Sequence, residues 1–263
     1  MKDLIIIGAG QAGLTMGHYL KQEEYNFLLL EAGNRIGDSW RNRYDSLQLF
    51  TPREYSSLPG MILKGEKNEF PHKNEIAMYL EEYAQYFQLP VQLQTEVIKI
   101  RKEEEIFELH TPTEILQSKK VIIASGGFQQ PYIPSFSQHL SSHVYQIHSS
   151  QYKSPSQIPK GKVLVVGGGN SGMQIAVELA KTHEVTMSIS HPLTYLPLHL
   201  FRKSIFNWLE ELGLLYAEVN TKRGKWFQKR KDPIFGFEGK NLSEIYGIIC
   251  TKKDVSYDTR LYK

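Results

Sequence analysis

The chain has 263 residues, enough for two medium-sized domains, and its hydrophobic fraction of 41% and charged fraction of 22% predict a soluble globular protein. The net charge of +3 comes from balanced acids and bases without an arginine-rich arm, so nothing argues for a nucleic acid partner. No apolar stretch approaches the length of a membrane span, no signal peptide follows Lys2, and the one cysteine, Cys250, excludes an internal disulfide. We therefore expect a cytoplasmic protein, and the sequence carries no signal for its oligomeric state.

The first element is a buried strand that runs into a glycine-rich turn. Leu4 to Ile7 are four consecutive apolar residues, three of them β-branched, as in a strand covered on both faces. A helical run then opens with G-x-G-x-x-G spacing at Gly8, Gly10 and Gly13. The first glycine makes the tight turn, the second lets the backbone approach a pyrophosphate, and the third lets the helix pack close to the strand. The helix N-terminus supplies free N–H groups for phosphates.

A second strand, Phe27 to Leu30, ends in the acid Glu31, about 20 residues after the glycines. An acid at this place accepts hydrogen bonds from a ribose. Because strand, turn, helix, second strand and acid occur in order, the segment predicts an adenine dinucleotide site. The motif alone leaves FAD and NAD open.

The loop after Glu31 is polar, glycine-rich and dense in arginines and aromatics, which suits a large anionic cofactor as well as a solvated surface. It reads R-I-G-D-S-W-R-N-R-Y-D-S-L-Q-L-F-T-P from Arg35 to Pro52. With G-A-G-Q-A-G and Glu31 before it, this loop resembles the FAD end of the flavin-containing monooxygenase-like flavoproteins, whose usual form is G-G-x-W-x-x-R-Y-x-x-L-x-L-x-T-P. The resemblance implies FAD at the first glycine motif, along Gly8, Gly10, Gln11, Ala12 and Gly13.

The same resemblance implies roles for residues further along the chain. It places Trp40 and Arg41 beside the flavin and its phosphates, and Val97 against the adenine. The segment V-I-I-A-S-G-G-F-Q-Q-P-Y-I-P stands where the family has A-T-G followed by prolines, so Ala124 and Gly126 would close the FAD site.

His148 and Tyr152 match only the end of the family fingerprint F-x-G-x-x-x-H-x-x-x-Y/F. We assign neither residue a catalytic role, because no second acid–base group is predicted beside them. The sequence offers no convincing nucleophile triad and no metal site.

A second glycine motif repeats the opening logic. Val163 to Val166 form a buried strand, and an apolar helix then opens with G-x-G-x-x-G at Gly167, Gly169 and Gly172. Asn170 and Ser171 put an amide and a hydroxyl by the phosphates, and the family has the same form, G-x-G-N-S-G. Two such motifs indicate one site for FAD and one for a nicotinamide dinucleotide.

The strand Val185 to Ile189 would set the nicotinamide preference. NADPH binders usually carry an arginine near the end of this strand, whereas here Ser190, His191 and Pro192 follow, with no acid to favour NADH. The resemblance favours NADPH, and NADH stays open.

These elements predict an α/β protein with two Rossmann-like domains, an FAD-binding domain over residues 1–157 and an NAD(P)H-binding domain over residues 158–263, with a small antiparallel meander. We also expect a helix after an N-cap at Asn74 and a helical insert from Leu196 to Leu215. Members of the family return to the FAD domain after the nicotinamide domain, but no returning glycine-rich strand is recognisable after about residue 240. We therefore expect a C-terminally truncated or split chain with an incomplete nicotinamide domain.

The resemblance implies an enzyme in which NAD(P)H reduces FAD and the reduced flavin reacts with oxygen to give a peroxyflavin that oxygenates a small molecule. A flavoprotein disulfide reductase is excluded on chemistry, because it needs a dithiol pair and Cys250 is alone. An NAD(P)H oxidase or reductase stays open, as does a dinucleotide-binding fragment without activity of its own.

Overall fold

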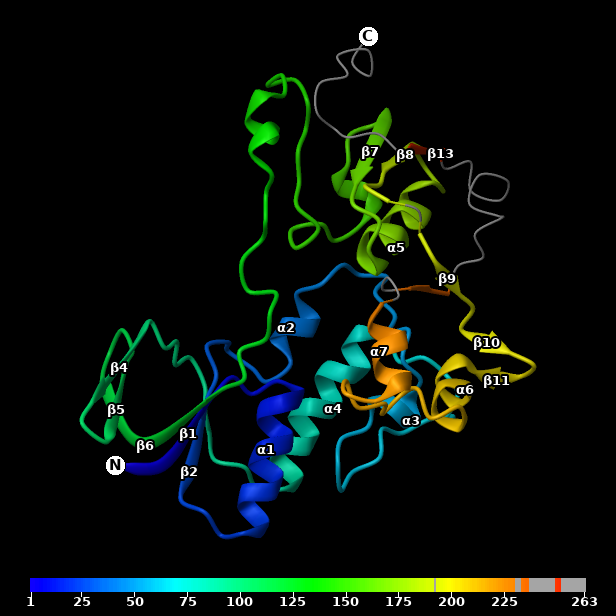
Figure 1. Ribbon diagram of the computed structural model, residues 1–263. Helices are drawn as coiled ribbons and strands as arrows, with labels where there is room; N and C mark the ends of the chain where they lie inside the picture. The colour runs from blue at the N-terminus through cyan, green and yellow to red at the C-terminus, as the bar shows by residue number, and fades with distance from the viewer. Residues whose placement is uncertain (192, 230–232, 237–248, 252–263) are drawn as a thin grey trace. The chain divides into compact units, whose positions relative to one another are not determined.

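The computed structural model describes residues 1–191, 193–229, 233–236 and 249–251 (Figure 1). It divides into two compact units: unit 1 holds Met1–Arg43 and Ser56–Pro131, and unit 2 holds Tyr44–Tyr55 and Tyr132–Lys263. The sequence prediction that no glycine-rich strand returns near the C-terminus falls largely on residues 237–248 and 252–263, which lie outside the described residues.

Unit 1 is built on a six-stranded sheet in the order β3-β2-β1-β6-β5-β4. The first four strands in this order pair in parallel, and β6-β5-β4 form the antiparallel meander that the sequence predicts. The strands are β1 (Lys2–Ile7), β2 (Phe27–Leu30), β3 (Val91–Gln92), β4 (Lys99–Glu103), β5 (Ile106–His110) and β6 (Ile115–Ile123). Ile5 of β1 lies opposite Leu28 on one side and Val121 on the other, so β1 lies between two parallel partners. Its apolar residues point to both faces of the sheet, as in a strand that is covered on both sides.

Four helices belong to this part of the chain: α1 (Gln11–Gln22), α2 (Asp38–Arg41), α3 (Arg53–Ser56, across the boundary between the units) and α4 (Lys73–Tyr86). α4 begins before the predicted N-cap at Asn74. His72 is the N-cap instead: its ring accepts from the Asn74 N–H at 3.3 Å, while the Glu75 carboxylate accepts from the His72 N–H at 2.7 Å. This reciprocal pair is a capping box with histidine in place of serine or threonine, so a pattern of usual N-caps misses it.

Unit 2 contains a second parallel sheet in the order β13-β8-β7, made of β7 (Lys162–Val166), β8 (Glu184–Ser188) and β13 (Ile249–Thr251). Helix α5 (Asn170–Leu179) follows β7 directly and packs its apolar face on the sheet (Figure 1). Its buried residues Met173, Ala176 and Leu179 join Val185 and Met187 of β8 in one core cluster. The spacing of three residues between the buried helix positions is the pattern of a helix covered on one side.

The rest of unit 2 consists of short elements. They are the 3-10 helices η1 (Ser135–His139) and η2 (Pro155–Gln157), the parallel pair β9 (Tyr195–Leu196) and β12 (Ile234–Phe235), the hairpin of β10 (His199–Leu200) and β11 (Lys203–Ser204), α6 (Ile205–Glu211) and α7 (Lys222–Gln228). The predicted helical insert is therefore shorter than expected. It starts at Ile205, because the buried Ser204 side chain accepts from the Phe206 N–H and caps α6.

Candidate cofactor sites

The first glycine turn lies where β1 ends and α1 begins. The Gly8 N–H donates to the Leu30 carbonyl at 2.7 Å, and the φ of Gly8 is +103°, which favours glycine. A Cβ on Gly13 would lie 2.0 Å from the Gly8 carbonyl oxygen. The helix thus packs against the turn at a distance that only glycine permits without a shift, as the spacing predicts.

The middle glycine of this turn has a different environment. Gly10 is the N-cap of α1, and a Cβ placed on it would meet nothing within 4 Å. The protein itself therefore gives no reason for a glycine at this position. The open space lies at the N-terminus of a helix, where backbone N–H groups favour a phosphate, so the cradle fits a dinucleotide.

Glu31 stands beside the same turn at the end of β2. Its carboxylate accepts from the Ala9 N–H at 2.9 Å and from the Gly33 N–H at 3.0 Å. Backbone donors on both sides fix the orientation of the carboxylate at the edge of the cradle. A ribose hydroxyl would be a further donor to this carboxylate.

Gln11 and Trp40 come together in the fold, although the sequence separates them. The Trp40 indole N–H donates to the Gln11 side-chain oxygen at 3.3 Å, which holds the ring near the first turn of α1. Ala12, on the same turn, is exposed. The fold therefore brings Trp40 to the glycine cradle.

Arg41 is engaged mainly by protein groups. Its guanidinium donates to the Ile36 carbonyl at 2.6 Å and pairs with Asp38 at 3.1 Å and Glu81 at 2.9 Å. The neighbouring pair of Arg35 with Glu81 is the main cause that holds the pKa of the Glu81 carboxyl below its usual value. A phosphate bound by Arg41 would have to replace or share one of these partners.

Lys73 is a structural residue for which the sequence predicts no role. It is 4% exposed, and its ammonium donates to the carbonyls of Arg41 and Arg43 at 3.1 and 2.5 Å. A buried lysine needs such partners, because desolvating its charge is costly. It fixes the backbone of the loop that carries Trp40, and the motif F-P-H-K at Phe70–Lys73 was the available signal.

The residues expected at the far end of the first site also lie near this cradle. The Thr95 N–H donates to the Glu31 carbonyl at 2.9 Å, which brings the connection between β3 and β4, where Val97 lies, beside Glu31. The Ala124 N–H donates to the Ile7 carbonyl at 2.8 Å, and Gly126 has a φ of +79° in the turn that follows. Glu31 thus follows β2, Ala124 and Gly126 follow β6, and Val97 lies in the connection between β3 and β4, all in one sheet.

The second glycine turn repeats the geometry of the first. The Gly167 N–H donates to the Ser188 carbonyl at 2.9 Å, and a Cβ on Gly172 would lie 2.4 Å from the Gly167 oxygen. Gly169, the N-cap of α5, has nothing within 4 Å of a Cβ position. The second cradle therefore has the same open centre and the same close helix contact, and it too fits a dinucleotide.

Asn170 has a role that the sequence did not indicate. Its side-chain oxygen accepts from the Phe235 N–H at 2.9 Å, which ties β12 to the first turn of α5. The Phe235 ring stacks on Phe50 with a centroid distance of 4.8 Å and an angle of 9°. The amide oxygen of Asn170 thus binds protein, whereas Ser171 is exposed beside the cradle.

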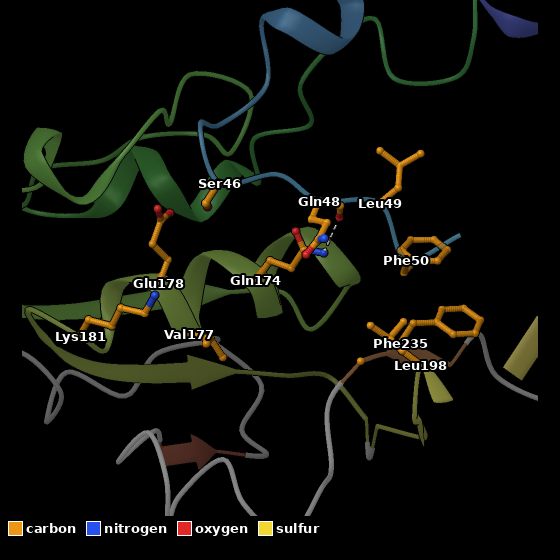
Figure 2. A pocket seen from close by; sticks show the side chains of 11 residues that line it. Ser46, Gln48, Leu49, Phe50, Gln174, Val177, Glu178, Lys181, Leu198 and Phe235 are labelled. Carbon is orange, nitrogen blue, oxygen red and sulfur yellow. Dashed lines mark hydrogen bonds between the residues drawn. The ribbon is translucent and has the colours of Figure 1, made fainter. Parts of the chain in front are cut away.

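Segment 44–50, part of the loop expected to lie around FAD, packs within unit 2 on α5 (Figure 2). The Tyr44 hydroxyl donates to the Gln174 oxygen at 2.7 Å, and the Gln174 amide donates to the Gln48 carbonyl at 3.1 Å. Tyr152, 2% exposed, donates its hydroxyl to Glu178 at 2.8 Å. Burial, together with the Glu178 carboxylate, raises the pKa of the Tyr152 phenol, so this residue stays a protonated donor.

Ser190 and His191 follow β8, at the position where the sequence predicts the choice between NADPH and NADH. Both are exposed, and the Ser190 hydroxyl and the His191 ring nitrogen Nδ1 lie 3.0 Å apart.

Within the described part of the chain, no group of three acidic, histidine or cysteine side chains could hold a metal ion. None of the described helices is both long enough and apolar enough to cross a membrane.

The fold has two glycine cradles that each follow a parallel strand, which is the arrangement of dinucleotide-binding oxidoreductases. A comparison with protein families agrees: the pyridine nucleotide-disulphide oxidoreductase family matches residues 5–196. The chain belongs to this family and is a flavin-dependent oxidoreductase. The disulphide chemistry in the family name does not follow for a chain whose one cysteine is Cys250.

Similar proteins include an uncharacterized CzcO-like oxidoreductase of Geobacillus kaustophilus, 55% identical over 91% of this chain and 69% of that protein. A probable indole-3-pyruvate monooxygenase of Arabidopsis thaliana, YUCCA1, is 34% identical over 72% of this chain and 48% of the plant protein. Among solved structures, the flavin-containing monooxygenase from Stenotrophomonas maltophilia superposes with a TM-score of 0.73 and 25% identity, over 89% of this chain and 69% of the other. The expected fold class and the resemblance to flavin-containing monooxygenases are thereby confirmed.

Proposed function

We propose that the chain binds FAD in the cradle of unit 1 and NAD(P)H in the cradle of unit 2, and that it catalyses NAD(P)H-dependent oxygenation of a small molecule. The observation that carries this proposal is the pair of open positions at Gly10 and Gly169, each at the N-terminus of a helix after a parallel strand. The division into an FAD domain over residues 1–157 and a nicotinamide domain over residues 158–263 is part of the proposal.

In unit 1, the residues divide the work of holding FAD. The N–H groups at Gly10, Gln11 and Ala12 would bind the pyrophosphate, and Glu31 would accept from the ribose. Trp40, held by Gln11, would flank the cofactor, and Val97, Ala124 and Gly126 would line it with small or apolar groups.

In unit 2, the backbone of residues 167–172 and the Ser171 hydroxyl would bind the nicotinamide dinucleotide. NADPH is the proposed donor; Ser190 and His191 can donate to a 2′-phosphate, and no acid stands there to repel it. Bound flavin supplies the redox and oxygen chemistry, so the chain needs no nucleophilic side chain. The similar plant protein YUCCA1 is a probable indole-3-pyruvate monooxygenase, which favours oxygenation over simple oxidase activity.

The test measures the fate of oxygen while the purified, FAD-loaded chain turns over NADPH with a panel of small sulfides, amines and 2-oxo acids. Incorporation of ¹⁸O from labelled oxygen gas into a product supports the proposal. Recovery of all NADPH electrons as hydrogen peroxide with every compound would point to an oxidase or reductase instead. The matched control is Gly169→Ala, because the added methyl group occupies the open space of the nicotinamide cradle and leaves the residues of unit 1 unchanged.

A further inference from the structure

A groove in unit 2 runs along α5 on the side that faces segment 46–50 (Figure 2). Its volume is about 240 Å³, large enough for a molecule of the size of an amino acid. The lining positions on α5 run from Gln174 to Glu178, beyond the helix turn that holds the glycine cradle, and Lys181 follows just after the helix ends at Leu179. Since an α-helix rises about 1.5 Å per residue, the helical lining positions from Gln174 to Glu178 span about 6 Å. The groove is therefore separate from the proposed phosphate contacts.

One end of the groove carries two opposite charges. Glu178 lies in the last turn of α5, Lys181 lies three residues further on in the turn after the helix, and Figure 2 shows both at the same end of the groove. Residues at this spacing often form an ion pair, but none is formed here among the described residues. Glu178 is held by the Tyr152 hydroxyl at 2.8 Å instead. The anion and the cation are thus presented separately to the groove.

The other end is apolar. Figure 2 shows Leu49, Phe50, Leu198 and Phe235 there, and the two phenylalanine rings stack on each other. Between the two ends, the amide of Gln174 already bonds to the Gln48 carbonyl and accepts from the Tyr44 hydroxyl. Because this amide is satisfied by protein groups, the middle of the groove does not demand a polar ligand atom.

We propose that this groove binds a free α-amino acid with an aromatic or apolar side chain. The carboxylate pairs with Lys181, the ammonium pairs with Glu178, and the side chain lies toward Leu49, Phe50 and Leu198. A simple anion would face the Glu178 carboxylate and a simple amine would face Lys181, so a zwitterion alone satisfies both charges. This site is additional to the proposed cofactor sites.

The first experiment is calorimetric titration of the purified chain with three molecules that share the phenylethyl group. L-Phenylalanine carries both charges, 3-phenylpropionate only the carboxylate, and 2-phenylethylamine only the ammonium. We expect L-phenylalanine to bind with a Kd of about 1 mM or below and the other two at least about tenfold more weakly. No binding of L-phenylalanine up to about 10 mM, or equal binding of all three, would overturn the proposal.

Variants locate the site. Lys181→Met and Glu178→Gln each remove one charge at nearly constant size, and the glutamine can still accept from Tyr152. Each is expected to weaken L-phenylalanine binding about tenfold or more. The matched control is Lys162→Met, because Lys162 is an exposed lysine of the same unit that pairs with Glu184 at 3.2 Å. If the control loses as much affinity as Lys181→Met, or if neither groove variant loses any, binding is not in this groove and the assignment fails.

Discussion

Replacing Gly10 by alanine separates the role of this glycine in cofactor binding from any role in folding. Its φ of −79° is accessible to every residue, and an added Cβ meets nothing within 4 Å. The change in the free energy of unfolding should stay within about 1 kcal/mol, since the gain from a stiffer unfolded chain offsets the poorer N-cap. The new methyl group would, however, occupy the space in which a pyrophosphate has to approach the backbone.

The effect on FAD follows from the lost backbone contact. A hydrogen bond to a charged group is worth about 1.5–3 kcal/mol, so the Kd for FAD should rise roughly 10- to 100-fold. Gly13→Ala is the contrasting variant, because its Cβ would lie 2.0 Å from the Gly8 oxygen where ordinary contact begins at 3.4 Å. Forcing the helix away should cost about 3 kcal/mol of stability.

The assay pairs urea unfolding of the cofactor-free chain with titration of FAD, followed by flavin fluorescence. We expect Gly10→Ala to keep the wild-type unfolding midpoint and lose affinity, and Gly13→Ala to lose stability. Wild-type affinity for FAD in Gly10→Ala would refute the placement of the pyrophosphate at this cradle. A large loss of stability in the same variant would show that the glycine is needed for folding instead.

Four further changes follow from the same geometry. Gly169→Ala should leave the FAD affinity unchanged and weaken NADPH binding roughly 10- to 100-fold, measured by the NADPH concentration that half-saturates flavin reduction. Glu31→Ala leaves two backbone N–H groups without their acceptor and should lower stability by about 1–3 kcal/mol in urea unfolding, with a weaker FAD site. Lys73→Met should cost about 2 kcal/mol or more in the same assay, since two carbonyls of the adjoining loop lose a charged donor. The pKa of the Glu81 carboxyl is lowered chiefly by its hydrogen bond from Arg35. The stability that this carboxylate contributes is therefore complete above the unfolded-state pKa and is lost as pH falls through the lower folded-state pKa. Unfolding midpoints between pH 7 and pH 3 should fall less steeply in Glu81→Gln than in the wild type.

The elements that local chemistry specifies were predictable from the sequence. The strand at Leu4 to Ile7, the glycine turn, the helix and the strand ending before Glu31 all occur where expected, because each depends on neighbours a few residues away. The second strand, turn and helix also occur where expected, but the prediction that Val163 to Val166 are buried is wrong: β7 lies at the end of its sheet, and Leu164 is 37% and Val166 51% exposed. Glycine spacing reports backbone geometry directly, so it transfers from sequence to structure without knowledge of the tertiary fold.

Contacts between residues distant in sequence were not predictable. The partner of the Asn170 amide is the Phe235 N–H, and the carbonyls of Arg41 and Arg43 are held by Lys73. In each case the residue type was noticeable, but its partner lies tens of residues away and only the fold brings the two together. The packing of segment 44–50 on α5 is of the same kind, since its polar and aromatic residues fit a cofactor loop equally well.

We propose that this one chain binds both FAD and a nicotinamide dinucleotide. The most direct test is the visible spectrum of the freshly purified chain, supplemented with FAD and freed of the excess, followed by anaerobic addition of NADPH. We expect the absorbance of bound flavin and its bleaching by NADPH, with NADH as the comparison. A chain that remains colourless after FAD is added would contradict the first site, and bound flavin that neither NADPH nor NADH bleaches would contradict the second.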